Sequence, residues 1–126
     1  MGKYVDGYVF VVPDDKTEDY IQMARDGARI WKELGALEYF ECRGDDLIPK
    51  PAGEDTLVAF PAMAKAKPGE TVWFSFIVFK SKEHRDEVNA KVNAQMEMDK
   101  IEYQGVPMPF DMSRMAYGGF EVVVEG

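Results

Sequence analysis

The chain repeats one pattern: an apolar strand, an amphipathic helix and a second strand. The strands are expected at Tyr4–Val12, Ala36–Arg43, Thr71–Phe79 and Met115–Glu125, and the helices near 16–34 and 82–96. Two such units in series, βαββαβ, predict an α+β ferredoxin-like fold with an antiparallel sheet. In that fold the strands lie in the order 4-1-3-2, and both helices cover one face of the sheet.

Length and charge limit what such a chain can be. We expect residues 1–126 to form one domain, because this length is usual for a single core. The formal charge of −8 argues against nucleic-acid binding, which depends on basic side chains that neutralise phosphates. No apolar run is long enough to span a membrane, and no signal peptide is evident. We therefore expect a bacterial-type cytoplasmic protein without a membrane partner.

The first helix has one apolar stripe with an unusual residue in it. The stripe follows three- and four-residue spacing and contains Tyr20, Met23, Ala24, Gly27, Ile30, Trp31 and Leu34. Glycine in mid-helix costs about 1 kcal/mol relative to alanine, so we expect Gly27 to allow a close approach of helix and sheet. Gly35 follows the stripe as the expected helix stop.

The strands look apolar on both faces, which implies a covering for the second face. The strand at Thr71–Phe79 is almost entirely apolar and is expected at the centre of the sheet. Large apolar patches are rare on soluble monomers. We therefore expect a homodimer in which two sheets pack face to face, as a dimeric α/β barrel. The alternative is a monomer whose long connection folds over the sheet.

That connection is the stretch Leu47–Glu70, which holds four of the seven prolines (Pro49, Pro51, Pro61 and Pro68). We expect Leu57–Phe60 to extend the edge strand and Pro61–Lys65 to form one helical turn. A second loop is expected at Tyr103–Phe110, which contains Pro107 and Pro109.

Glycines interrupt two neighbouring strands at Gly7 and at Gly118–Gly119. Glycine in a strand marks either a bulge with tight packing or a close approach of another group. If the missing side chains leave a hollow, it would be lined by Tyr8, Trp73 or Tyr117, which we take as candidate ligand-binding residues.

Three ionisable side chains are candidates for catalysis: Asp6, His84 and Arg114. Asp6 lies inside an apolar strand, so it is either at the rim or buried and paired. Arg114, at the start of the neighbouring strand, is the expected partner. A buried acid with a raised pKa could serve as a general base. His84, the single histidine, is either a general base or ligand, or a solvated or capping residue.

The remaining candidates have simpler interpretations. Glu38 and Glu41 lie on opposite faces of the edge strand, so they cannot act as one pair of carboxylates, and we expect both to be solvated. Cys42 is a lone thiol with no activating neighbour in the sequence. One histidine and one cysteine cannot supply the usual zinc ligands, so we expect no metal and no cofactor.

Several segments together resemble the YbaA-like family of uncharacterised bacterial proteins. The segments are Tyr4-Val5-Asp6-Gly7, Gly35-Ala36-Leu37-Glu38-Tyr39, Glu41-Cys42 with Gly44-Asp45-Asp46, His84-Arg85-Asp86 with Val88-Asn89, Met108-Pro109-Phe110-Asp111 and Tyr117-Gly118-Gly119-Phe120. The resemblance spans nearly the whole chain and implies the dimeric α/β-barrel superfamily. It implies no catalytic residues, because the family has no established activity.

Two functions follow from these observations. The first is binding of a small, partly apolar molecule in a pocket between sheet and helices. The superfamily that the resemblance implies adds cofactor-free oxygenase or isomerase chemistry as one extension of it. The second is a non-enzymatic homodimeric binding or interaction module. The sequence does not separate an enzyme from such a module. A connected cavity on which at least two polar groups converge would favour the first.

Overall fold

The computed structural model describes residues 2–49, 57–99 and 109–126. It contains a single four-stranded sheet in the order β2-β3-β1-β4, in which all neighbouring strands are antiparallel. The strands are β1 (Tyr4–Pro13), β2 (Glu38–Arg43), β3 (Glu70–Phe79) and β4 (Ala116–Glu121). The helices are α1 (Thr17–Glu33), α2 (Phe60–Met63) and α3 (Lys82–Asp99), with short 3-10 turns at η1 (Asp14–Lys16) and η3 (Met112–Arg114). The ferredoxin-like order expected from the sequence is confirmed.

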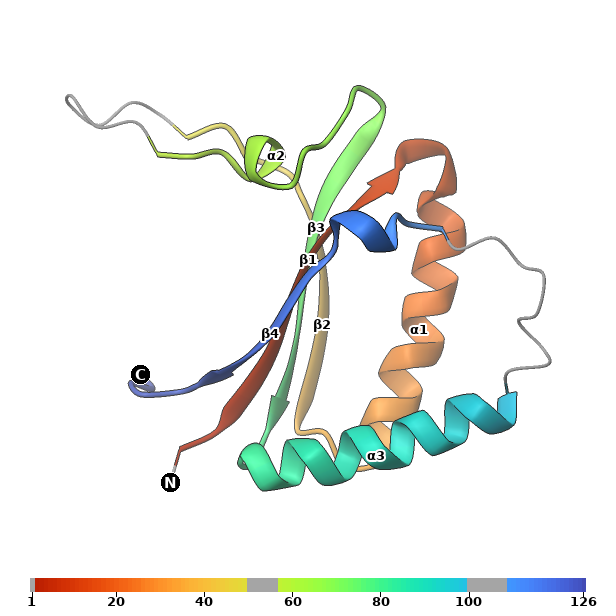
Figure 1. The fold of residues 1–126 in the computed structure, drawn as a ribbon, viewed down its shortest axis with the longest axis vertical. Coiled ribbons are helices and arrows are strands. Elements are labelled where there is room, and N and C mark those ends of the chain that lie inside the picture. The colour runs from red at the N-terminus through yellow and green to blue at the C-terminus, as the bar shows by residue number, and fades with distance from the viewer. Residues whose placement is uncertain (1, 50–56, 100–108) are drawn as a thin grey trace.

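The long helices α1 and α3 both lie against one face of the sheet, and α2 lies on the other side (Figure 1). The register places Tyr8, Ser75 and Glu41 on the helix-covered face. Val9, Phe74 and Cys42 alternate with them and lie on the opposite face. The register therefore shows which residues of each strand face the helices and which face away from them.

The core lies between the sheet and the two long helices. One cluster joins Phe10 and Val12 of β1 to Tyr20 and Ala24 of α1 and to Trp73. A second cluster joins β3 to α3, and its buried members are Ala36, Ile77, Phe79, Val88 and Val92. The hydrophobic stripe of α1 therefore packs on the sheet as its spacing predicts, apart from Met23, which is exposed.

Glycine allows the closest approach of α1 to the sheet. A Cβ atom at Gly27 would lie 3.0 Å from the hydroxyl oxygen of Tyr39 on β2. Gly35 ends the helix with a φ of +122°, a conformation that other residues rarely adopt. Both expectations for these glycines are confirmed.

Several boundaries differ from the expectations. The last strand ends at Glu121 rather than Glu125, because its pairing with β1 ends where β1 begins. Residues 57–59 are not a strand, and the helical turn begins at Phe60 instead. The loop expected at Tyr103–Phe110 lies mostly outside the described residues.

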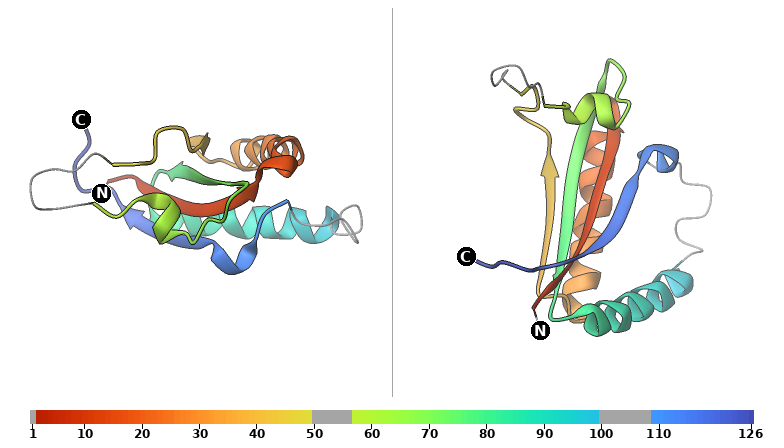
Figure 2. Two further views of the ribbon diagram at one scale, coloured as in Figure 1. Left: turned by 90° about the horizontal axis from the view of Figure 1, so that it is seen from above. Right: turned by 60° about the vertical axis from the view of Figure 1, so that its left-hand side comes forward.

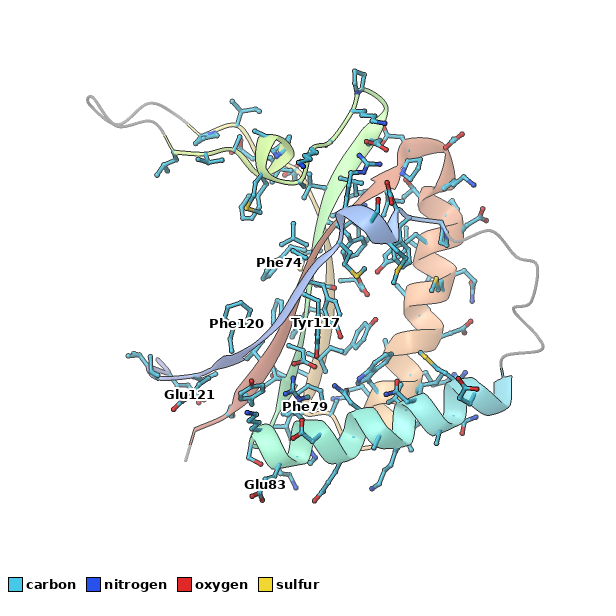
Figure 3. The ribbon with its side chains drawn as sticks, viewed as in Figure 1. Phe74, Phe79, Glu83, Tyr117, Phe120 and Glu121 are labelled. Atoms are coloured by element: carbon cyan, nitrogen blue, oxygen red, sulfur yellow. The ribbon has the colours of Figure 1, made fainter. Side chains whose placement is uncertain are left out.

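The second face of the sheet is covered only in part. Ala64, just after α2, and Leu47 pack on Val11 and Val72 at one end. Beyond that end, Phe74 is 44% exposed and Phe120 is 62% exposed. Both side chains project from the sheet away from α1 and α3 (Figure 3). We call this surface, formed by Phe40, Phe74, Phe76 and Phe120, the open face.

No helix among the described residues is long and apolar enough to cross a membrane. The cytoplasmic location expected from the sequence stays a prediction.

Candidate functional site

A row of polar side chains crosses the helix-covered face of the sheet. Glu41 of β2 pairs with Ser75 of β3, Ser75 pairs with Tyr8 of β1, and Tyr8 pairs with Tyr117 of β4. We call these four residues the polar row. Phe10 and Ile77, which neighbour the row on the same face, are apolar and buried.

Asp6 lies beside this row and is completely buried, with 0% of its surface exposed. Its Oδ1 accepts a hydrogen bond of 2.7 Å from Nη1 of Arg85, and its Oδ2 accepts one of 3.1 Å from Nδ2 of Asn89. The hydroxyl of Tyr117 donates to Oδ2 at 3.2 Å. The carboxylate therefore binds donors from α3 and from β4 at once. A buried charge is tolerated where it is paired and hydrogen-bonded in this way.

Arg85 reaches Asp6 because Gly119 leaves room for it. A Cβ atom at Gly119 would lie 2.9 Å from Nη1 of Arg85 and would overlap the Tyr4 hydroxyl. The guanidinium carbon lies 4.8 Å from the centre of the Tyr4 ring, and Nε donates to Asp86 at 2.7 Å. Aromatic and carboxylate contacts together fix the guanidinium in place.

The partner expected for Asp6 was Arg114, and that prediction is wrong. In the antiparallel register Asp6 lies opposite Gly119, five residues beyond Arg114, which is about 17 Å along a strand. Arg114 instead binds both carboxylate oxygens of Glu70 at 2.7 Å, and its Nε donates to Asp111 at 2.8 Å. The bonds to Arg114 hold the pKa of Glu70 at about 2. This cluster joins η3 to the start of β3.

The other end of the polar row holds a second carboxylate. Glu41 accepts hydrogen bonds from the hydroxyls of Tyr20, at 2.8 Å, and Tyr39, at 2.7 Å. Ser75 also hydrogen-bonds to it. Burial raises the pKa of Glu41 above its usual value, although these hydrogen bonds oppose the shift. The expectation that Glu41 is a solvated edge residue is therefore wrong, because α1 brings Tyr20 over it.

An open cavity of about 490 Å³ lies above the Tyr8 and Tyr117 end of the row. Its lining comes from the sheet, from α1 and α3, and from the segment at η3: Tyr8, Trp31, Asn89, Asn93, Met112, Met115 and Tyr117. β4 diverges from β1 at the end where η3 lies (Figure 2). This divergence leaves the cavity between η3 and α3, and Arg114 holds the η3 side in place.

Hydrogen bonds connect the cavity wall to the buried acid. Nε1 of Trp31 donates to Oδ1 of Asn89 at 3.2 Å, and Nδ2 of Asn89 donates to Asp6. The rings of Tyr8 and Tyr117 lie 4.8 Å apart on the floor. Burial, followed by the charge of Asp6, raises the pKa of both tyrosines, so both phenols are neutral donors near pH 7.

The structure brings together three of the six candidate residues, Asp6, Tyr8 and Tyr117. His84 lies at the start of α3, where its Nδ1 accepts from the backbone nitrogen of Lys80 at 3.0 Å and its own backbone nitrogen donates to Ser81. Trp73 is buried in the core beside Tyr20, and its Nε1 has no partner among the described residues. Neither lines the cavity.

The glycines in the strands do not form this cavity. The ring of Phe120 lies 3.3 Å from where a Cβ atom of Gly7 would be, and 3.8 Å from that of Gly118. The interpretation of tight packing at these glycines is therefore confirmed. Sequence reasoning missed Asn89, Asn93 and Trp31 as lining residues. The one signal was that Asn89 lies four residues after Arg85, on the same side of a helix.

These features define a ferredoxin-like α+β protein with a polar site between its sheet and its helices. A solved structure described as a dimeric ferredoxin-like protein from an uncultured marine organism superposes with a TM-score of 0.65 over 100% of both chains, at 13% identity. Such a low identity supports the fold alone.

Residues 3–112 match DUF1428, a family of proteins of unknown function. The chain is also 43% identical over 123 residues to the uncharacterised protein YbaA of Escherichia coli strain K12, covering 98% of each chain. The YbaA protein of Shigella flexneri matches to the same extent. The chain therefore belongs to the DUF1428 family, and the resemblance to YbaA-like proteins is confirmed.

The buried ion pair gives a first prediction. Replacing Arg85 by Met should lower the free energy of unfolding by about 3–5 kcal/mol, because Asp6 stays buried without its cation. Arg29→Met is the matched control: Arg29 forms an exposed pair with Glu33, and its loss should cost less than about 1 kcal/mol. Urea denaturation at pH 7 measures both. Equal losses in the two variants would contradict a dominant role for the Asp6–Arg85 pair.

Glu41 gives a prediction for pH dependence. Because its folded pKa is raised, its contribution to stability is complete below the unfolded pKa, near 4.5, and is lost as the pH rises through the folded value. The stability of the parent relative to Glu41→Gln should therefore fall between pH 4.5 and 7. Urea denaturation across this range tests it, and a rising difference would show that the pKa is lowered instead.

Proposed function

We propose that this protein binds a small, partly apolar molecule in the cavity between its sheet and α3. The observation that carries the proposal is the convergence of polar groups on one apolar hollow. Two tyrosines and Asn93 line this cavity together with Trp31 and two methionines. Pockets for small molecules combine an apolar lining with a few placed polar groups in this way, and 490 Å³ is within their usual range.

Chemistry at this site would depend on the Tyr117–Asp6 pair. Tyr117 joins the buried carboxylate to the cavity from β4, as Asn89 does from α3, since its hydroxyl donates to Asp6 and its side chain lines the cavity. The phenol oxygen can accept a hydrogen bond from a bound molecule, and it can protonate an oxygen of that molecule once its hydrogen turns away from Asp6. Cofactor-free oxygenase or isomerase chemistry is compatible with such a donor. Binding is the part that the geometry supports best.

The protomer in this proposal is half of a homodimer whose two open faces pack together. The rings of Phe40 and Phe76 are stacked at 4.9 Å, and Phe74 lies 5.6 Å from Phe76, so the aromatic surface is continuous. Water contact with such a surface is unfavourable, and a second copy would remove it. The similar marine protein is described as dimeric. A purely structural module, without a ligand, would use the same interface.

Native mass spectrometry of gently purified protein tests the ligand. The parent should carry an additional mass that Asn93→Trp loses, because the indole would fill the mouth of the cavity. Gln22→Trp, on the exposed side of α1, is the matched control and should keep that mass. The contrary result is a parent protein that carries no additional mass and whose melting temperature is not raised by any compound of a metabolite library. That result would leave the non-enzymatic module as the function.

Light scattering after size-exclusion chromatography tests the dimer. Phe74→Glu should convert a dimer into a monomer, because it places two buried charges at the centre of the interface. Met23→Glu on α1, with a similar exposed fraction of 37% against 44%, should stay dimeric. A monomeric parent protein would refute the packing of open faces.

A further inference from the structure

The charged groups nearest the cavity are already paired with each other. Asp6 and Arg85 lie beneath Tyr117 as an ion pair of 2.7 Å, and Arg85 also binds Asp86. Arg85, Asn89 and Tyr117 already donate hydrogen bonds to Asp6. A cationic ligand would therefore find no unpaired carboxylate there. Among the described lining residues, the tyrosine phenols are the sole ionisable groups, and their raised pKa values keep them neutral.

A charged ligand would therefore lose water without gaining a partner. An anion would meet no free cation among the described lining residues and would lie near the carboxylates of Asp6 and Glu41. A cation would lie near the guanidinium of Arg85, which is 3.3 Å from the Tyr117 hydroxyl. Desolvation of an unpaired ion costs several kcal/mol, and no charge of opposite sign in the described lining would offset that cost.

Two polar groups of the lining have no hydrogen-bond partner within the described part of the chain: the hydroxyl of Tyr8 and the amide of Asn93. Asn89 differs from Asn93, because its amide already binds Trp31 and Asp6. The ligand should therefore carry a hydroxyl or carbonyl group that reaches Tyr8 at the floor. The rest of its surface would contact aromatic rings and the thioethers of Met112 and Met115, which favour a flat apolar body.

We infer that the ligand is an uncharged, planar aromatic molecule that binds the Tyr8 hydroxyl through a hydroxyl or carbonyl oxygen. This inference rests on the proposed function, since it specifies what the same cavity holds. It makes Tyr8 a specificity residue, which selects ligands that carry a hydroxyl or carbonyl oxygen. It also explains selection against ionic ligands, because Asp6 and Arg85 are already paired with each other.

Three probes that share a naphthalene ring and differ in charge test the inference: 2-naphthol, 2-naphthoate and the cation (2-naphthyl)methylammonium. Calorimetry should show that 2-naphthol binds at least about 10-fold more tightly than either ion. The indole N–H signal of Trp31 should shift on its addition, which places the probe in the cavity. Tighter binding of either ion, or equal binding of all three, would overturn the inference and leave the cavity as a binding site.

The role of Tyr8 has its own control. Tyr8→Phe should weaken 2-naphthol binding by about 2- to 10-fold, the usual contribution of one hydrogen bond, and leave 2-methylnaphthalene binding unchanged. Tyr39→Phe should change neither, because the Tyr39 hydroxyl binds Glu41 and does not line the cavity. An equal loss for both compounds would show that Tyr8 acts through packing alone, against the inference.

Failure of the inference and failure of the proposed function give different results. If no probe binds and the native protein carries a retained mass, the cavity has a ligand of another class. If no probe binds and the native protein is bare in the mass spectrum, the proposed function itself fails.

Discussion

The buried carboxylate of Asp6 is the constraint on which the rest of this site depends. A charge with 0% exposure inside an apolar strand requires donors, and the structure supplies them from α3 and from β4. The same contacts fix the position of α3 relative to the sheet, and they hold Tyr117 and Asn89 at the cavity. Each residue that donates to Asp6 also belongs either to α3 or to the cavity wall. Loss of one of these donors would therefore disturb both the packing of the helix and the wall of the cavity.

Two carboxylates occupy opposite sides of Tyr8 in different environments. Asp6 is bonded to a guanidinium, whereas Glu41 is bonded to the neutral hydroxyls of Tyr20 and Tyr39. The contrast explains why Glu41 has a raised pKa, since burial is not offset there by a cation. The carboxylates of both acids already accept hydrogen bonds from these protein donors. The free hydrogen-bonding capacity at the polar row is left to Tyr8, beside the cavity.

Much of the fold could be predicted from the sequence, and the site only in part. The periodicity of the strands and of α1 is local, so element order, the role of Gly27 and the apolar second face followed directly from it. Asp6, Tyr8 and Tyr117 could be chosen because they lie on strands expected to be neighbours. The partner of Asp6 could not be predicted, because the order of residues in the chain says little about which of two arginines lies within 3 Å of its carboxylate. The antiparallel register moves Arg114 away from Asp6, and α3 brings Arg85 in.

The sequence by itself determined the layers: a sheet covered by two helices on one face and left apolar on the other. It did so because alternation and helical spacing encode which side of each element is apolar. The tertiary structure alone decided which polar groups meet. Glu41 became a half-buried acid when α1 placed Tyr20 over it, and the cavity opened where β4 diverges from β1 toward η3 (Figure 2). Contacts of this kind join residues that are distant in the chain, and they depend on crossing positions and register, which no local pattern specifies.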